Sequence, residues 1–158
     1  MSPAAILEPA LWAGLFAIGL AAMLTAPVRY LLPSFFCAFI GRAVRDILTD
    51  QGMSVNWATV LAATAVVLVA VLLTRRNMVS PVVLICGVLP LGAAVAMFNL
   101  IFALMQLSTA KADALNEASL ALGANVGKVF VTSLAIALGL GAGLAICRLF
   151  KRDDVAEV

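Results

Sequence analysis

The stretch MVSPVVLICGVLPLGAAVAMFNLIFALMQL, residues 78–107, has no charged side chain and carries a proline near its middle. A straight α-helix of this length would extend about 45 Å, whereas the hydrocarbon core of a bilayer is about 30 Å thick. Pro90 lacks a backbone donor and clashes with the preceding turn, so the helix should kink or split there. We therefore predict a membrane helix that is interrupted at Pro90 and Gly92.

Four more apolar segments surround this block in the sequence. They cover about residues 6–26, 31–48, 56–73 and 120–147. Of all residues, 65% are apolar and only 11% are charged, whereas soluble domains carry roughly 25% charged residues. We predict an all-α, polytopic integral membrane helical bundle of about five transmembrane helices. It would form a single transmembrane domain over residues 1–158, with a short charged cytoplasmic tail at 148–158.

The distribution of Lys and Arg predicts the orientation of the bundle, because cytoplasmic loops are enriched in these residues. With five crossings, one side of the membrane receives Arg29, Arg75, Arg76, Arg148, Lys151 and Arg152. The other side receives Arg42, Arg45, Lys111 and Lys128. We therefore expect the N-terminus outside and the C-terminus in the cytoplasm of a bacterial-type plasma (inner) membrane. The second segment is only marginally long enough to cross, but with four crossings this charge asymmetry disappears.

The second segment ends in GRAVRDILTD, residues 41–50, where charges lie in helical register. Arg42, Arg45 and Asp46 fall on one face, and Arg42 with Asp46 forms an i,i+4 pair. Two interpretations are open. The helix could end near Val44, with its charges snorkelling to the headgroups. Alternatively, the face lines a solute path or contacts a partner, because each charge held in lipid costs about 2.5–3.5 kcal/mol.

Three polar side chains interrupt the later apolar segments, and each needs a partner inside a membrane. Asn99 and Asn125 are candidates for helix–helix hydrogen bonds or for substrate contact. For Lys128, near the predicted start of the last helix, we favour snorkelling. Two glycine pairs with small-xxx-small spacing, Gly123/Gly127 and Gly139/Gly143, permit close approach of a neighbouring helix.

Several classes of function are disfavoured by the sequence. The chain has no histidine, no serine-centred elbow and no phosphate-binding glycine loop, so we do not expect an enzyme. Its three cysteines lie in apolar segments without metal-ligand spacing, and we predict neither a metal nor a cofactor. The basic residues do not form one patch, so we expect no nucleic-acid partner.

An ordered set of residues resembles the threonine/serine exporter (ThrE) family, in particular its short YjjB-like membrane subunit, which corresponds to the C-terminal ThrE-type domain. The set comprises PVRYL with Arg29, Gly41, Arg45, Gly52, NWAT with Trp57 and Thr59, Arg75, and SP with Pro81. Pro90 and Asn125 have plausible counterparts, whereas Arg42 and Asp46 are not part of the pattern.

The resemblance implies the membrane subunit of a secondary exporter for small polar metabolites, with threonine and serine as the first candidates and succinate as the alternative. It also implies a longer ThrE-like partner, copies of the chain itself, or both. We expect Arg45, Asn99 and Asn125 to bind the substrate, with Arg42 and Asp46 as a coupling group or an ion pair. The alternative from another class is a membrane scaffold that assembles a partner and transports nothing.

Overall fold

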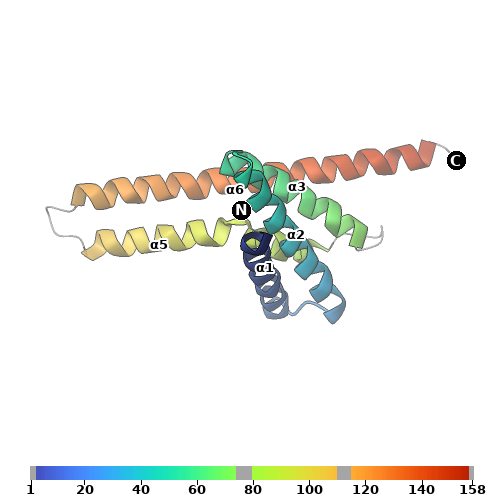
Figure 1. Cartoon of the computed structure of the whole chain (residues 1–158), viewed down its shortest axis with the longest axis horizontal. Helices are drawn as coiled ribbons and strands as arrows, with labels where there is room; N and C mark the ends of the chain where they lie inside the picture. Colours follow the sequence, from blue (N-terminus) through green and yellow to red (C-terminus); the bar gives the residue numbers. More distant parts are fainter. Residues whose placement is uncertain (1–2, 74–79, 110–114, 157–158) are drawn as a thin grey trace.

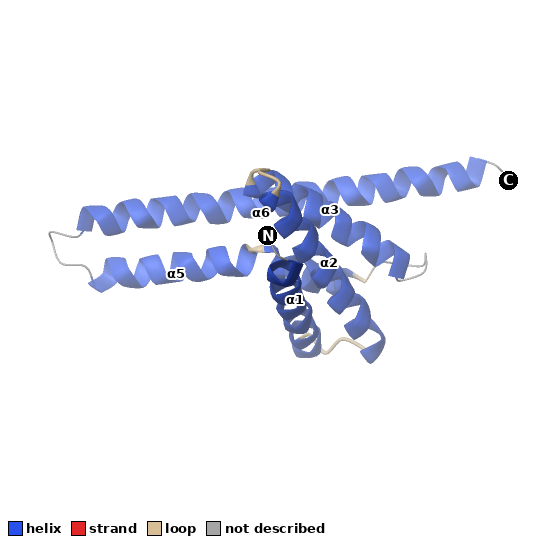
Figure 2. Ribbon diagram, in the orientation of Figure 1, coloured by secondary structure: helices blue, strands red, loops and turns tan. Residues whose placement is uncertain are grey.

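The computed structural model describes residues 3–73, 80–109 and 115–156, and every regular element in these ranges is helical (Figures 1 and 2). The α-helices are α1 (Pro3–Met23), α2 (Leu31–Asp50), α3 (Val55–Leu73), α4 (Pro81–Val88), α5 (Ala93–Thr109) and α6 (Leu115–Ala156). Two 3-10 turns, η1 (Val28–Tyr30) and η2 (Leu89–Leu91), precede α2 and α5. The all-α prediction is confirmed. Of the cations used to predict orientation, Arg75, Arg76 and Lys111 lie outside the described residues.

The interruption predicted near Pro90 is confirmed. α4 ends at Val88, Pro90 lies within η2, and Gly92 follows with φ +115° before α5 begins. The two halves are bent by 57° relative to each other. Glycine is the residue that adopts this backbone conformation at little cost, so Pro90 and Gly92 together produce the break.

Four of the five expected crossings have the length and composition of membrane spans within the described residues. Three are single helices, Ile6–Met23, Val55–Leu73 and Leu115–Leu149. The fourth is the bent pair of Pro81–Leu91 with Val95–Thr109. α2 has 20 residues but is not among them, because Arg42, Arg45 and Asp46 place too many charged residues in it for a membrane span.

α2 nevertheless lies at the centre of the packed part of the molecule, between α1, α3 and α4 (Figure 1). Its inner side contributes Cys37 to a core shared with Val66 of α3 and with Val83 and Leu91 of the interrupted helix. A Cβ added at Gly41 of α2 would lie 2.5 Å from the Val66 side chain. Small residues therefore bring α2 and α3 into direct backbone proximity.

α6 is the longest element, and its 42 residues correspond to about 63 Å. Its first half runs antiparallel beside α5, and its second half lies along α3 (Figure 1). The helix begins before the predicted residue 120 and continues through most of the predicted tail, since residues 148–156 contain no glycine or proline to end it. This placement brings α6 opposite the charged end of α2.

Candidate functional site

A cavity of about 610 Å³ lies where α2, the start of α3, the start of α5 and the middle of α6 meet. Its volume falls in the range of roughly 300–1,000 Å³ that is typical of small-molecule sites. Its polar lining consists of Arg42, Arg45, Asn56, Asn99, Lys128 and Thr132. Valines of α3, α5 and α6, with Gly92, Ala96 and Gly127, complete the wall. Polar groups from four helices therefore converge on one space.

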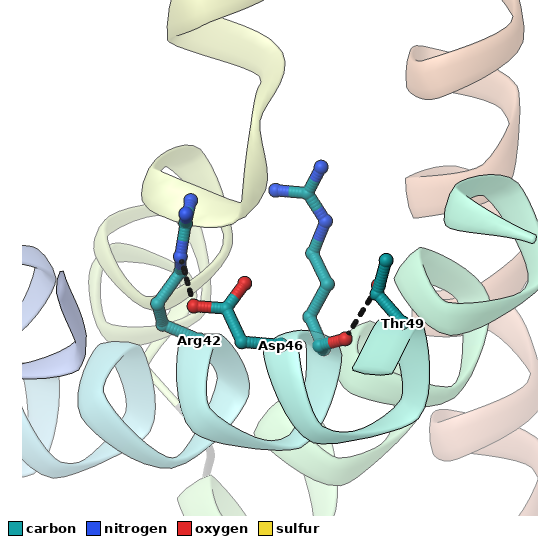
Figure 3. A network of polar contacts seen from close by, with 4 residues as sticks. Arg42, Asp46 and Thr49 are labelled. Atoms are coloured by element: carbon teal, nitrogen blue, oxygen red, sulfur yellow. Dashed lines mark hydrogen bonds and ion pairs between the residues drawn. The ribbon is translucent and has the colours of Figure 1, made fainter. Parts of the chain in front are cut away.

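Arg42 and Asp46 form an ion pair along α2 (Figure 3). Nε of Arg42 donates to Oδ2 of Asp46 at 2.9 Å, and the two side chains are 27% and 21% exposed. This i,i+4 pair was predicted from the spacing. The Asp46 carboxylate offsets the charge of Arg42, so this arginine adds little free charge to the cavity.

Arg45 is held differently. Its carbonyl accepts a hydrogen bond of 2.8 Å from the Thr49 hydroxyl (Figure 3), while its half-buried side chain lines the cavity. The guanidinium lies against Gly92 at the helix break. Within the described part of the chain, no carboxylate forms an ion pair with it. Arg45 is therefore available for an anion.

The structure brings four of the candidate residues together and leaves Asn125, Pro90 and Asp46 outside the lining of the cavity. Arg42, Arg45, Gly92 and Asn99 share the cavity, whereas Asn125 lies on α6 outside the lining. Pro90 is half-buried in η2 and marks the break without lining the cavity itself.

Sequence reasoning did not assign three of the polar lining residues, Asn56, Lys128 and Thr132, to a site. Snorkelling of Lys128 stays a prediction, and its side chain also lines the cavity together with the α2 arginines. The signal was the spacing of Lys128 and Thr132, which puts two polar residues on one face of an apolar helix. Asn56, the second residue of α3, gave no comparable signal because polar residues are common at helix starts.

The charge of the lining is positive. Arg45 and Lys128 contribute cations, Arg42 is paired with Asp46, and no acidic residue in the described part of the chain lines the cavity. Among the described residues, no cluster of three or more potential metal ligands is found, and Cys37, Cys86 and Cys147 are free thiols. The arrangement suits a small anion bound by guanidinium, ammonium and amide groups.

Comparison with known proteins identifies one family. The family model described as Threonine/Serine exporter, ThrE, matches residues 9–150. No match was found among curated proteins or among solved structures. The matched range contains all the residues that line the cavity. The chain is therefore a multi-pass membrane protein that belongs to the ThrE threonine/serine exporter family.

Proposed function

We propose that this chain is the membrane subunit of a secondary exporter for small polar metabolites, with threonine and serine as its first candidate substrates. The observation that carries the proposal is the cavity beside the helix break, on whose wall the Arg45 side chain forms no ion pair among the described residues. Family membership supplies the class of function. Interrupted helices are common sites of solute binding in secondary transporters.

In this proposal the substrate carboxylate binds the Arg45 guanidinium, which presents two parallel donors to a carboxylate. Asn99 of α5 donates or accepts a further hydrogen bond, and Lys128 of α6 adds a second positive charge. α5 begins directly after Gly92 of the cavity wall, so the positive end of its dipole also favours an anion there. The proposal does not depend on Asn125.

A second candidate, export of a dicarboxylate such as succinate, is favoured by one specific observation. Among the described residues, the lining has the cations Arg45 and Lys128, the paired Arg42 and no acid, so it offers no anionic partner to the ammonium group of an amino acid. A dianion could use Arg45 and Lys128 together. The two candidates differ in what Lys128 contributes, because loss of this cation should weaken the binding of a dianion more than the binding of a zwitterion.

We also propose that the exporter is completed by a longer ThrE-like subunit, by copies of this chain, or by both. α5 and the first half of α6 extend away from the packed helices (Figure 1), and large apolar side chains such as Phe98, Phe102 and Phe130 are exposed along them. Lipid or a partner has to cover these faces. The proton-coupling carboxylate is assigned to the partner, since no acid among the described residues lines the cavity.

The proposed orientation keeps the N-terminus outside and the C-terminus in the cytoplasm, with α2 crossing as a short helix shielded by its neighbours. Single cysteines near each terminus would test it. A membrane-impermeant thiol reagent added to intact cells should label the N-terminal position only, and labelling of both termini or of neither would contradict it.

The direct test of the function is flux from proteoliposomes that contain the chain with its longer subunit, preloaded with L-threonine or with succinate. We expect Arg45→Ala to raise KM about tenfold or more, the loss typical of one charge-assisted hydrogen bond, while assembly stays intact. Arg148→Ala, an exposed cation of α6 away from the cavity, is the control. If the natural substrate is a dicarboxylate, Lys128→Ala should reduce the flux of succinate more than the flux of L-threonine.

The same measurement separates the exporter from the scaffold. Normal flux in the Arg45→Ala variant would exclude Arg45 as a substrate ligand. Loss of assembly in that variant would make Arg45 a contact residue and favour the scaffold.

A further inference from the structure

Gly92 meets two separate structural demands. Its φ of +115° lies in a region that side chains rarely adopt. Its carbonyl also accepts the backbone N–H of Ala96 at 3.0 Å, which starts α5. The positive φ accounts for a glycine at the break, whereas any residue could accept this hydrogen bond.

The space above Gly92 is occupied by Arg45. A Cβ at position 92 would lie 2.9 Å from Nη1, 3.2 Å from Nη2 and 3.3 Å from Cζ of Arg45. Apart from the two chain neighbours of Gly92, no other atom of the described residues is as close to that point. Because the contacting group is the end of a long, flexible side chain, a larger residue at position 92 would displace the guanidinium and leave the helices in place.

Gly52 provides an internal comparison. It also has a positive φ, +86°, but a Cβ there would meet nothing within 4 Å among the described residues. A substitution at Gly52 therefore adds backbone strain alone, whereas one at Gly92 adds strain and removes the space that Arg45 occupies.

We propose that Gly92 is a positioning residue for substrate binding, which acts by seating the Arg45 guanidinium on the cavity wall. This inference rests on the proposed function of Arg45 as the carboxylate ligand. An arginine held in one place loses less conformational freedom when it binds. Without its contact with Gly92, the Arg45 guanidinium can turn toward Asp46, the next residue in the chain, which already binds Arg42.

The test uses proteoliposomes that contain the chain with its longer subunit and measures KM and maximal rate for L-threonine and succinate. We compare Gly92→Ala, Gly92→Asn and Gly52→Ala, each in the wild-type and the Arg45→Ala background. Asn tolerates positive φ better than Ala, so Gly92→Asn fills the space next to the Arg45 guanidinium with less backbone strain.

We expect Gly92→Ala and Gly92→Asn to raise KM about tenfold or more, as loss of one charge-assisted hydrogen bond does. Gly52→Ala should leave KM unchanged. In the Arg45→Ala background, neither Gly92 variant should raise KM further, because the displaced group is gone. A purely structural role would produce the same additional defect in both backgrounds and would overturn the proposal.

Protein yield is also informative. If the Gly92→Ala protein accumulates only when Arg45 is also replaced, the added methyl group clashes with the guanidinium, as proposed. If it fails to accumulate in both backgrounds, backbone strain alone explains the defect, and the proposed role of Gly92 in positioning Arg45 is refuted. A normal KM in Arg45→Ala itself would refute the proposed function. A raised KM in Arg45→Ala combined with a normal KM in both Gly92 variants would refute only the role of Gly92.

Discussion

At the scale of residues, two arginines on one face of α2 are held in different ways. Arg42 donates to Asp46 at 2.9 Å, while Arg45 lies against Gly92 and forms no ion pair with a described carboxylate. A paired, partly exposed arginine contributes little beyond local stability. The unpaired one keeps its donors for a ligand, which explains why we assign substrate binding to Arg45.

The same contrast gives a prediction for Asp46. Asp46→Asn removes the ionic partner of Arg42 but no group that carries protons through the cavity, so the pH dependence of export should keep its shape. The lost pair should reduce the free energy of unfolding by only about 0.2–1 kcal/mol. Export rates measured across a pH series would check this. A flattened pH profile in the variant would instead assign proton coupling to Asp46.

At the scale of elements, α3 and α6 pack through two glycines of α6. A Cβ at Gly143 would lie 2.7 Å from Val67, and one at Gly139 would collide with the carbonyl of Val60. The Thr64 hydroxyl also lies 3.1 Å from the Gly139 carbonyl, to which it donates. This close approach fixes where along α3 the long helix crosses.

Gly139→Ala should therefore destabilise the chain by about 1–3 kcal/mol, the usual cost of overpacking. Gly141→Ala, two residues along the same helix, is the matched control, because a Cβ there meets nothing within 4 Å among the described residues. It should be neutral or stabilising by up to about 1 kcal/mol. Denaturant unfolding in detergent micelles would measure both. Equal effects of the two substitutions would show that Gly139 does not mediate the contact.

Local chemistry predicted several of these elements. The lengths of the apolar segments indicated the helices, and Pro90 indicated the break, because both depend on the sequence in their own neighbourhood. The spacing of Gly139 and Gly143 indicated a close helix contact, but a Cβ at Gly123 or Gly127, which have the same spacing, would meet no described residue within 4 Å. Spacing shows which face can be approached closely, and only the tertiary arrangement decides whether a helix does so.

The site was predictable only in part for the same reason. Arg42, Arg45 and Asn99 stood out because charges and amides are costly in apolar sequence. The sequence predicts Lys128 near a helix end, but α6 starts earlier and places it across from α2. No local signal could show that the middle of α6 faces the end of α2.

At the scale of the whole molecule, the length of α6 exceeds what a bilayer can cover. Its apolar part, Leu115–Leu149, has 35 residues and therefore extends about 52 Å. Even at a tilt of about 40° it would span about 40 Å, beyond a hydrocarbon core of roughly 30 Å. Other polypeptide should therefore cover part of α6.

This mismatch predicts a stable complex. A tagged chain co-expressed with a longer ThrE-like subunit should co-purify it, or further copies of itself, in mild detergent, whereas a tagged unrelated multi-pass protein should not. Recovery of a single copy that exports substrate in proteoliposomes without any partner would contradict this account.

The central claim is that the charged end of α2 faces a substrate cavity and not lipid. Its most direct test is thiol labelling of Thr132→Cys, a lining position, and of Leu134→Cys, an exposed apolar position of α6 outside the lining, after Cys37, Cys86 and Cys147 are replaced by alanine. A hydrophilic thiol reagent should label position 132 and not position 134, and L-threonine or succinate should slow the labelling. Resistance of position 132 to the reagent, or labelling that neither substrate affects, would contradict the claim.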